Sequence, residues 1–177
     1  MAEMAPMFRP ALTHAAIGDE AAARLEPLAE GHVLHALSSE GTEDAEVRLA
    51  GIADGTVHAV RRYAPGHWFV VGSSRLDPAV VREKDAALGP NLILSDQSCG
   101  RVRLAVSGTG SRELLAKGSA VDFSARAFPL GSSAATLFNH IGVHVTRTGD
   151  DRFEMIVLRS FARSLWEELA LLSGRAP

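Results

Sequence analysis

The chain has 177 residues, of which 46% are hydrophobic and 22% are charged. These fractions are typical of a soluble globular protein, and the length suffices to bury a substantial core, which excludes disorder over the whole chain. A formal net charge of -3 argues against a nucleic-acid-binding protein, because such proteins neutralise phosphates with clustered basic residues. The single cysteine, Cys99, excludes an internal disulfide and any zinc or iron–sulfur site built from several cysteines.

The sequence carries no signal for a membrane. No segment reaches the roughly 18 consecutive apolar residues that a membrane-spanning helix requires. The stretch Met1–Pro10 contains no apolar run of the secretory kind. We therefore expect a cytoplasmic protein without a membrane partner.

The first 28 residues are rich in alanine, methionine and proline and have no sustained hydrophobic period. This composition predicts a flexible N-terminal arm, residues 1–28, with one short helix over Asp19–Leu25. Residues 29–177 carry regular patterns and are expected to form a single domain.

In the first half of this domain, short apolar runs alternate with turn residues such as Ala53-Asp54-Gly55, which is typical of strands. The predicted strands are Val33–Leu37, Glu46–Ile52, Thr56–Arg62, His67–Gly72 and Asn91–Leu94. Asp77-Pro78 supplies an N-cap and a first-turn proline, which predicts a helix over Ala79–Leu88.

The second half continues this alternation. A strand is predicted over Arg101–Ser107, where every second residue is apolar, and a helix over Ser111–Lys117. A loop is predicted over Ser119–Ser133, followed by an extended stretch over Ala134–Arg147 in which Gly142 is the candidate for a break. A strand is predicted over Arg152–Leu158. The last predicted element is a helix that begins at Ser160 and has one apolar face, formed by Phe161, Leu165, Leu169 and Leu172. Strands joined by tight turns and interspersed with helices predict an α+β fold, with mainly antiparallel sheets and helices packed on them.

The turn Gly108-Thr109-Gly110 precedes a predicted helix and is similar to the start of a dinucleotide-binding fingerprint. Glu113 occupies the sixth position, where that fingerprint requires a glycine. Glycines are also frequent in such turns for conformational reasons alone. We therefore interpret this segment as a structural turn.

Four histidines form two closely spaced pairs. His140 and His144 lie on the predicted extended stretch, where their Cα atoms would be roughly 13 Å apart, too far to share one metal ion. His32 and His35 have no cluster of Cys, Asp or Glu beside them. The sequence thus predicts no metal site, and no arrangement of a nucleophile and a base is apparent.

Two observations leave a structural and a binding role open. Asp122 lies between apolar Val121 and Phe123 and either counters an anion or forms a turn. Arginines suit a protein–protein surface because the guanidinium pairs bidentately with carboxylates, and the nearby aromatic residues belong either to that surface or to the core. These residues are Arg101, Arg103, Arg126, Arg159 and Arg163, with Phe123, Phe128, Phe138, Phe161 and Trp166.

Several consecutive segments of the C-terminal half match the pattern of one known family. They are Asp96–Leu104, Arg112–Gly118, Asp122-Phe123, Ala127–Ser132 and Phe153–Trp166. On these residues the chain resembles the gamma subunit of heterotetrameric sarcosine oxidase. The chain departs from the family at Gly66–Val71, and it carries Ser119 and Ser133 where the family has cysteines.

The resemblance implies a GcvT-like fold, similar to the folate-binding domains of aminomethyltransferases. It also implies a complex of four different subunits that demethylates sarcosine oxidatively and passes the one-carbon unit to tetrahydrofolate and electrons to oxygen. In that complex the alpha chain binds folate and NAD or FAD, the beta chain carries the substrate-oxidising flavin, and the delta chain binds zinc. FAD, FMN, NAD, tetrahydrofolate and zinc are thus implied for the other subunits, and no cofactor is implied for this chain.

We therefore expect a non-catalytic gamma-type subunit whose partners are alpha, beta and delta subunits, acting on sarcosine or a related N-methyl amine. Its predicted interface residues are Arg101, Arg103, Asp122, Phe128, Arg159 and Arg163. Two alternatives stay open. One is a stand-alone folate-binding or aminomethyl-transfer protein in which a carboxylate such as Asp122 faces a pterin. The other is a self-associating scaffold without a ligand.

Overall fold

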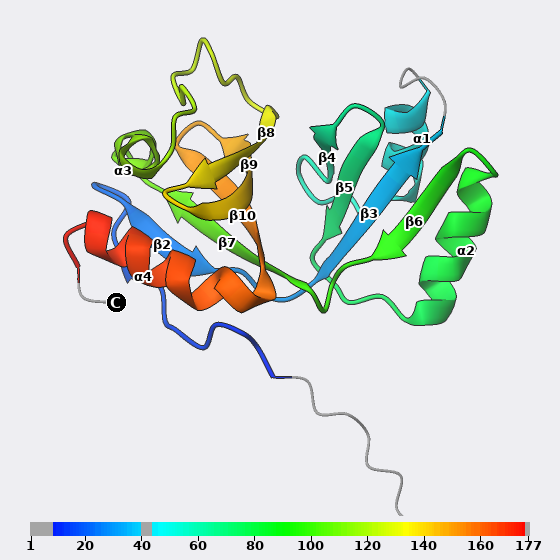
Figure 1. The fold of residues 1–177 in the computed structure, drawn as a ribbon, viewed down its shortest axis with the longest axis horizontal. Coiled ribbons are helices and arrows are strands. Elements are labelled where there is room, and N and C mark those ends of the chain that lie inside the picture. Colours follow the sequence, from blue (N-terminus) through cyan, green and yellow to red (C-terminus); the bar gives the residue numbers. More distant parts are fainter. Residues whose placement is uncertain (1–8, 40–43, 176–177) are drawn as a thin grey trace, which may run out of the picture.

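The computed structural model describes residues 9–39 and 44–175, and the strands in these ranges form two antiparallel sheets that lie side by side (Figure 1). The helices cover the outer faces of the sheets, so the layers follow the order helices, sheet, sheet, helices. This is an α+β architecture, as predicted. No helix within the described ranges is long and apolar enough to cross a membrane.

The larger sheet has six strands. In spatial order they are β1 (Ile17–Gly18), β2 (Arg24–Pro27), β7 (Arg101–Ser107), β10 (Arg152–Leu158), β9 (Ile141–Gly149) and β8 (Ser133–Phe138). Strands β7 and β10 pair over their full length, and Met155 of β10 lies opposite Leu104 of β7 and Val145 of β9. The helices on its outer face are α3 (Ser111–Gly118) and α4 (Ala162–Leu172), and α4 follows a 3-10 turn over Arg159–Phe161.

The smaller sheet has four strands, all from one continuous part of the chain. In spatial order they are β4 (Val60–Ala64), β5 (His67–Gly72), β3 (His32–Ser38) and β6 (Leu92–Asp96), with helices α1 (Ala45–Ile52) and α2 (Pro78–Leu88) on the outer face. This sheet is an insertion into the larger one, because β2 before it and β7 after it are hydrogen-bonded neighbours.

Each sheet has its own apolar core on its helix-covered face. On β7, the side chains of Val102, Leu104 and Val106 point towards α4 and pack with its fully buried Leu165 and Trp166. Side chains on one face of a strand recur every second residue, and those on one face of a helix recur about every 3.6 residues. Each element therefore buries one face and exposes the other.

The core of the smaller sheet follows the same rule. Leu34, Trp68 and Val70 on the strands contact Leu49 of α1 and Leu88 of α2. Helix α2 begins as predicted, since the Asp77 carboxylate accepts a hydrogen bond from the Ala79 N–H.

Most strands are confirmed at or near their predicted bounds. The predictions for His67–Gly72, Arg101–Ser107 and Arg152–Leu158 coincide with β5, β7 and β10. The helices predicted over Ala79–Leu88 and Ser111–Lys117 are confirmed to within one residue as α2 and α3.

The strand predicted over Glu46–Ile52 is wrong, because this segment is helix α1. In a strand, Val47 and Leu49 would lie on the same face. Instead Val47 is largely exposed, while Ala45 and Leu49, four residues apart, are buried. The strand predicted over Thr56–Arg62 begins only at Val60, because the chain before it turns around the Asp54 carboxylate.

The helix predicted over Asp19–Leu25 is also wrong. Residues 24–27 form β2, and Leu25 is fully buried opposite Val106 of β7. The predicted flexible arm therefore differs from the structure over its described part, because pairing with β7 holds this segment on the larger sheet. Residues 1–8 lie outside the described residues.

Two further corrections concern the C-terminal third. The extended stretch predicted over Ala134–Arg147 is the β8–β9 hairpin, which turns at Asn139-His140 and not at Gly142. Asn139 has a φ of 51°, and asparagine tolerates this left-handed conformation better than most residues. The last α-helix begins at Ala162, Ser160 makes no capping hydrogen bond, and Phe161 is 45% exposed.

Candidate functional site

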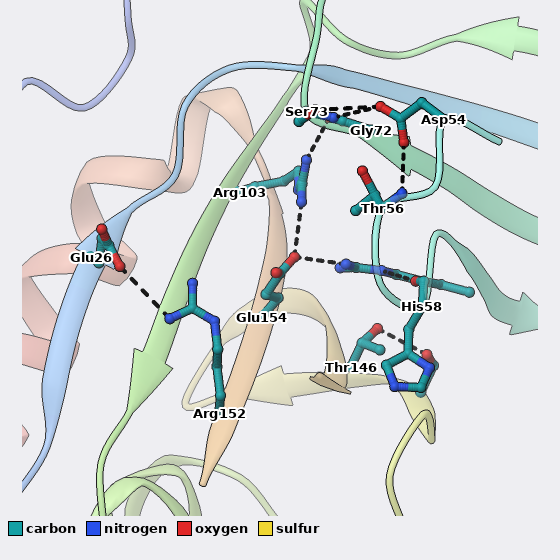
Figure 2. A network of polar contacts seen from close by, with 12 residues as sticks. Glu26, Asp54, Thr56, His58, Gly72, Ser73, Arg103, Thr146, Arg152 and Glu154 are labelled. Carbon is teal, nitrogen blue, oxygen red and sulfur yellow. Dashed lines mark hydrogen bonds and ion pairs between the residues drawn. The ribbon is translucent and has the colours of Figure 1, made fainter. Parts of the chain in front are cut away.

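The layer between the two sheets contains a buried ion-pair network. The Glu154 carboxylate on β10 accepts hydrogen bonds from Arg61 of β4 at 2.7 Å and from Arg103 of β7 at 3.0 Å. Arg103 also donates to the Gly72 carbonyl of β5 at 2.8 Å, so its guanidinium lies between the sheets (Figure 2). The network therefore ties the smaller sheet to the larger one.

This network holds two positive charges for one negative charge. Burial alone would raise the pKa of Glu154, but the charges and hydrogen bonds of Arg61 and Arg103 outweigh it and lower that pKa. Burial also lowers the pKa of Arg61, although Glu154 opposes the effect. Arg61 Nη1 and Arg103 Nε have no hydrogen-bond partner among the described residues. The inter-sheet layer thus carries excess positive charge.

Aromatic and histidine rings continue this layer towards the surface. The rings of His35, Tyr63, Phe69 and His144 form successive contacts, with centroids 5.1 to 5.9 Å apart. The Arg101 guanidinium lies over the Phe69 ring, 5.0 Å from its centroid, which is a cation–π geometry.

A cavity of about 190 Å³ opens beside these rings, and we call it the arginine pocket. Its walls come from five strands, one of the smaller sheet and four of the larger one. They include Tyr63 of β4, Arg101 of β7, His144 of β9, Leu158 of β10, and Ala135 and Thr136 of β8.

His144 is neutral in this pocket. Its ring is 1% exposed, and its Nε2–H donates to the Arg62 carbonyl at 2.9 Å. Burial lowers its pKa to about 4, helped by the nearby charges of Arg61 and Arg101 and opposed by the hydrogen bond to Arg62. Because Nε2 carries the proton, Nδ1 is an acceptor, and it is buried without a partner in the described part of the chain.

A second histidine pair lies at the edge of the same layer. His67 Nδ1 and His35 Nε2 are 3.2 Å apart, and burial together with the charges of His67 and Arg101 lowers the pKa of His35. Over residues 9–39 and 44–175, no group of three or more His, Cys, Asp or Glu side chains could hold a metal ion.

The structure divides the six predicted interface residues into two groups. Arg103 and Phe128 are buried in the interior of this chain. Arg103 is 8% exposed within the ion-pair network, and Phe128 is 6% exposed in ring contacts with Phe123 and Phe153. The contacts described for both side chains are with other residues of the same chain.

The other four residues reach the surface at separate places. Asp122 is exposed, and its carboxylate accepts a hydrogen bond from the Ser124 N–H, which is the turn-forming role. Arg159 is bonded to Glu30, and Arg163 to Glu167 on the same helix. Arg101 alone of the four lines the arginine pocket.

The turn Gly108-Thr109-Gly110 is confirmed as structural. Gly108 has a φ of +97°, and a Cβ on Gly110 would lie 2.9 Å from the Ala22 carbonyl oxygen. The N–H groups of Thr109 and Gly110 donate to the carbonyls of Glu20 and Ala22. Backbone groups that would cradle a phosphate are thus already bonded to the chain.

Sequence reasoning missed Arg61, Tyr63 and Glu154 as members of this layer. One signal was present: Glu154 stands between apolar residues on a strand in which its neighbours Phe153 and Met155 face the core. A charged residue on the other face of such a strand indicates that this face is also buried and that the charge is paired there with polar groups.

Residues 11–174 match the model of the sarcosine oxidase, gamma subunit family. The chain belongs to this family. No curated protein sequence is significantly similar to it.

Two solved structures share the fold. A chain of heterotetrameric sarcosine oxidase from Corynebacterium sp. U-96, in complex with pyrrole 2-carboxylate, superposes with a TM-score of 0.76 at 21% identity, over 90% of this chain and 88% of that one. The glycine cleavage system aminomethyltransferase T from Bartonella henselae superposes with a TM-score of 0.60 at 18% identity, over 85% of this chain and 46% of that one. The second structure supports the predicted GcvT-like fold.

Proposed function

We propose that this chain is the gamma-type subunit of a heterotetrameric, sarcosine-oxidase-like complex and contributes assembly rather than catalysis. The complex demethylates sarcosine or a related N-methyl amine oxidatively and passes the one-carbon unit to tetrahydrofolate. Alpha, beta and delta subunits are its partners, and they carry the FAD, FMN, NAD, tetrahydrofolate and zinc.

The observation that carries this proposal is the family match over residues 11–174, which spans both sheets. The surface supports it, because several large apolar side chains are exposed near the inter-sheet layer and the C-terminal helix. They are Tyr63, Leu137, Leu158, Phe161 and Leu171. Exposed apolar groups beside arginine are typical of protein–protein interfaces.

The alternative of a stand-alone folate-binding protein required a carboxylate that faces a pterin, for which Asp122 was the candidate. Asp122 is instead exposed and serves a turn. The likeness to an aminomethyltransferase concerns the fold, and a shared fold does not transfer an activity.

Native mass spectrometry of the tagged chain, produced alone and together with the other subunits, tests the proposal. We expect a four-component complex that carries flavin when the subunits are produced together. A monomer or homo-oligomer under both conditions would contradict the assembly role, and titration of the isolated chain with tetrahydrofolate would then test the alternative.

The non-catalytic role has its own measurement. Complexes that contain Cys99→Ser or His67→Gln should oxidise sarcosine with the wild-type kcat, because neither side chain is expected to contact the reacting atoms. A fall in kcat with assembly intact would place part of the chemistry on this chain.

A further inference from the structure

The arginine pocket holds a cation that has no carboxylate partner within the described part of the chain. No described carboxylate forms an ion pair with Arg101, whereas Arg61, Arg103 and Arg159 each bind a glutamate. Arg101 Nε is buried and has no hydrogen-bond partner among residues 9–39 and 44–175. Burial lowers the pKa of this guanidinium, although Tyr63 opposes the effect. A half-buried arginine of this kind stabilises a structure most when a carboxylate reaches it.

The remaining polar groups of the pocket do not supply that carboxylate. Tyr63 and Thr136 are uncharged wall residues. His144 is neutral, and its Nδ1 acceptor has no partner among the described residues. The positive charge of the nearby ion-pair network adds to that of Arg101. The pocket therefore favours an anion over a neutral or cationic group.

The size of the pocket limits what can enter. Its volume of about 190 Å³ is below the roughly 300–1,000 Å³ that is usual for small-molecule sites. One carboxylate side chain fits such a volume, and a folate or a nucleotide does not.

An apolar rim surrounds the opening. Leu158 pairs directly with Arg101 across β10 and β7, and it is 44% exposed. Leu137 lies opposite Gly142, a wall residue of the pocket, and is 58% exposed, while Tyr63 is 38% exposed. The strands β4, β7, β8 and β10 thus present a charged centre inside an apolar ring.

We propose that the arginine pocket is an anchor point for a neighbouring subunit, which inserts one Asp or Glu side chain against Arg101 and covers Leu137, Leu158 and Tyr63. This inference rests on the proposed function, since it assumes a complex. The arrangement matches the known pattern in which apolar contacts exclude water around a central charged or aromatic residue. The rim favours a protein over a free small carboxylate, because a small anion would leave these side chains exposed.

Substitution of Arg101 within the co-produced complex tests the inference. Arg101→Met keeps the length of the side chain and removes its charge, and Arg101→Lys keeps the charge and removes the planar fork. Arg82→Met is the matched control, because Arg82 is an exposed arginine on α2, on the outer face of the smaller sheet. Thermal unfolding of each isolated chain checks the fold, and the Kd for assembly is measured by native mass spectrometry over a dilution series.

We expect Arg101→Met to weaken assembly by about 30-fold or more, Arg101→Lys to weaken it less, and Arg82→Met to leave it unchanged. Equal assembly of Arg101→Met and wild type would overturn the anchor. Absence of assembly in the wild type would instead contradict the proposed function itself. Titration of the isolated chain with acetate and glutarate separates the remaining case: binding that Arg101→Met abolishes, with assembly unaffected, would make the pocket a small-anion site and also overturn the anchor.

Discussion

The outer faces of the two sheets and the layer between them are built from different chemistry. On the outer faces, aliphatic and aromatic residues pack against the helices in two large apolar clusters. Between the sheets, Val33, Phe69, Val71 and Ile156 form a smaller apolar cluster, and the same layer contains the buried Arg61, Arg103, Glu154 and His144. Apolar packing supplies stability without demanding particular partners, whereas a buried charge restricts which groups can lie beside it. We infer that the outer cores stabilise each sheet and the inter-sheet layer fixes how the sheets fit together.

The strongest test of the outer core is Trp166→Ala. Trp166 is fully buried, so its truncation should lower the free energy of unfolding by about 3–5 kcal/mol in urea denaturation. Phe161→Ala is the matched control, because Phe161 is aromatic but 45% exposed. Equal losses for the two variants would refute the distinction between core and surface on this side of the sheet.

The inter-sheet layer is tested by Glu154→Gln. This change leaves Arg61 and Arg103 buried without a counter-charge and should cost about 3–5 kcal/mol of stability. Replacing the three residues together, as Arg61→Met, Arg103→Met and Glu154→Leu, should recover most of that loss. Recovery would show that the network contributes specificity rather than net stability, while a further loss in the triple variant would contradict the comparison above.

The pH dependence of unfolding tests His144. The folded-state pKa of about 4 lies below the usual 6.5, so the unfolded chain takes up the proton first as pH falls. Stability contributed by the neutral ring is complete above pH 6.5 and is lost between pH 6.5 and 4, by up to about 3 kcal/mol. His144→Gln should flatten this part of the stability curve. An unchanged curve in that variant would show that the ring does not titrate there.

The smallest expected effect concerns the start of α2. Asp77→Ala removes the cap on the Ala79 N–H and should cost about 1 kcal/mol. Asp44→Ala is its control, because Asp44 occupies the same position before α1 and makes no side-chain capping bond. Thermal unfolding of both variants should separate them, and identical shifts would mean that the hydrogen bond contributes nothing.

Local sequence patterns predicted the elements whose two faces differ most. The strand Arg101–Ser107 was recognisable because apolar residues alternate with polar ones, and α2 because Asp77-Pro78 marks its start. The prediction failed at α1, where Val47 and Leu49 have the two-residue spacing that is typical of a strand. It also failed at β2, whose four residues are held as a strand by pairing with β7. The local sequence of a short segment contains no information about a strand that pairs with it from a distant part of the chain, as β7 pairs with β2.

The candidate site was predictable to a smaller extent for the same reason. Arg101 was singled out from its sequence position, and the structure places it in the pocket. Arg103, two residues later on the same face of the strand, is instead bonded to Glu154 and Gly72. The difference between them depends on which groups from β4, β5 and β10 lie opposite, and no local pattern contains that information.

The insertion of the smaller sheet between β2 and β7 has a consequence for synthesis on the ribosome. Its four strands lie within residues 32–96, so this sheet can form as soon as that segment has left the exit tunnel. Residues 24–27 must wait for β7, and β7 in turn gains its other neighbour, β10, only after residue 158. Late long-range pairing slows folding and leaves strand edges open. The edge of β2 that pairs with β7 therefore stays open until β7 has been synthesised, and an open strand edge exposes the nascent chain to aggregation during this interval.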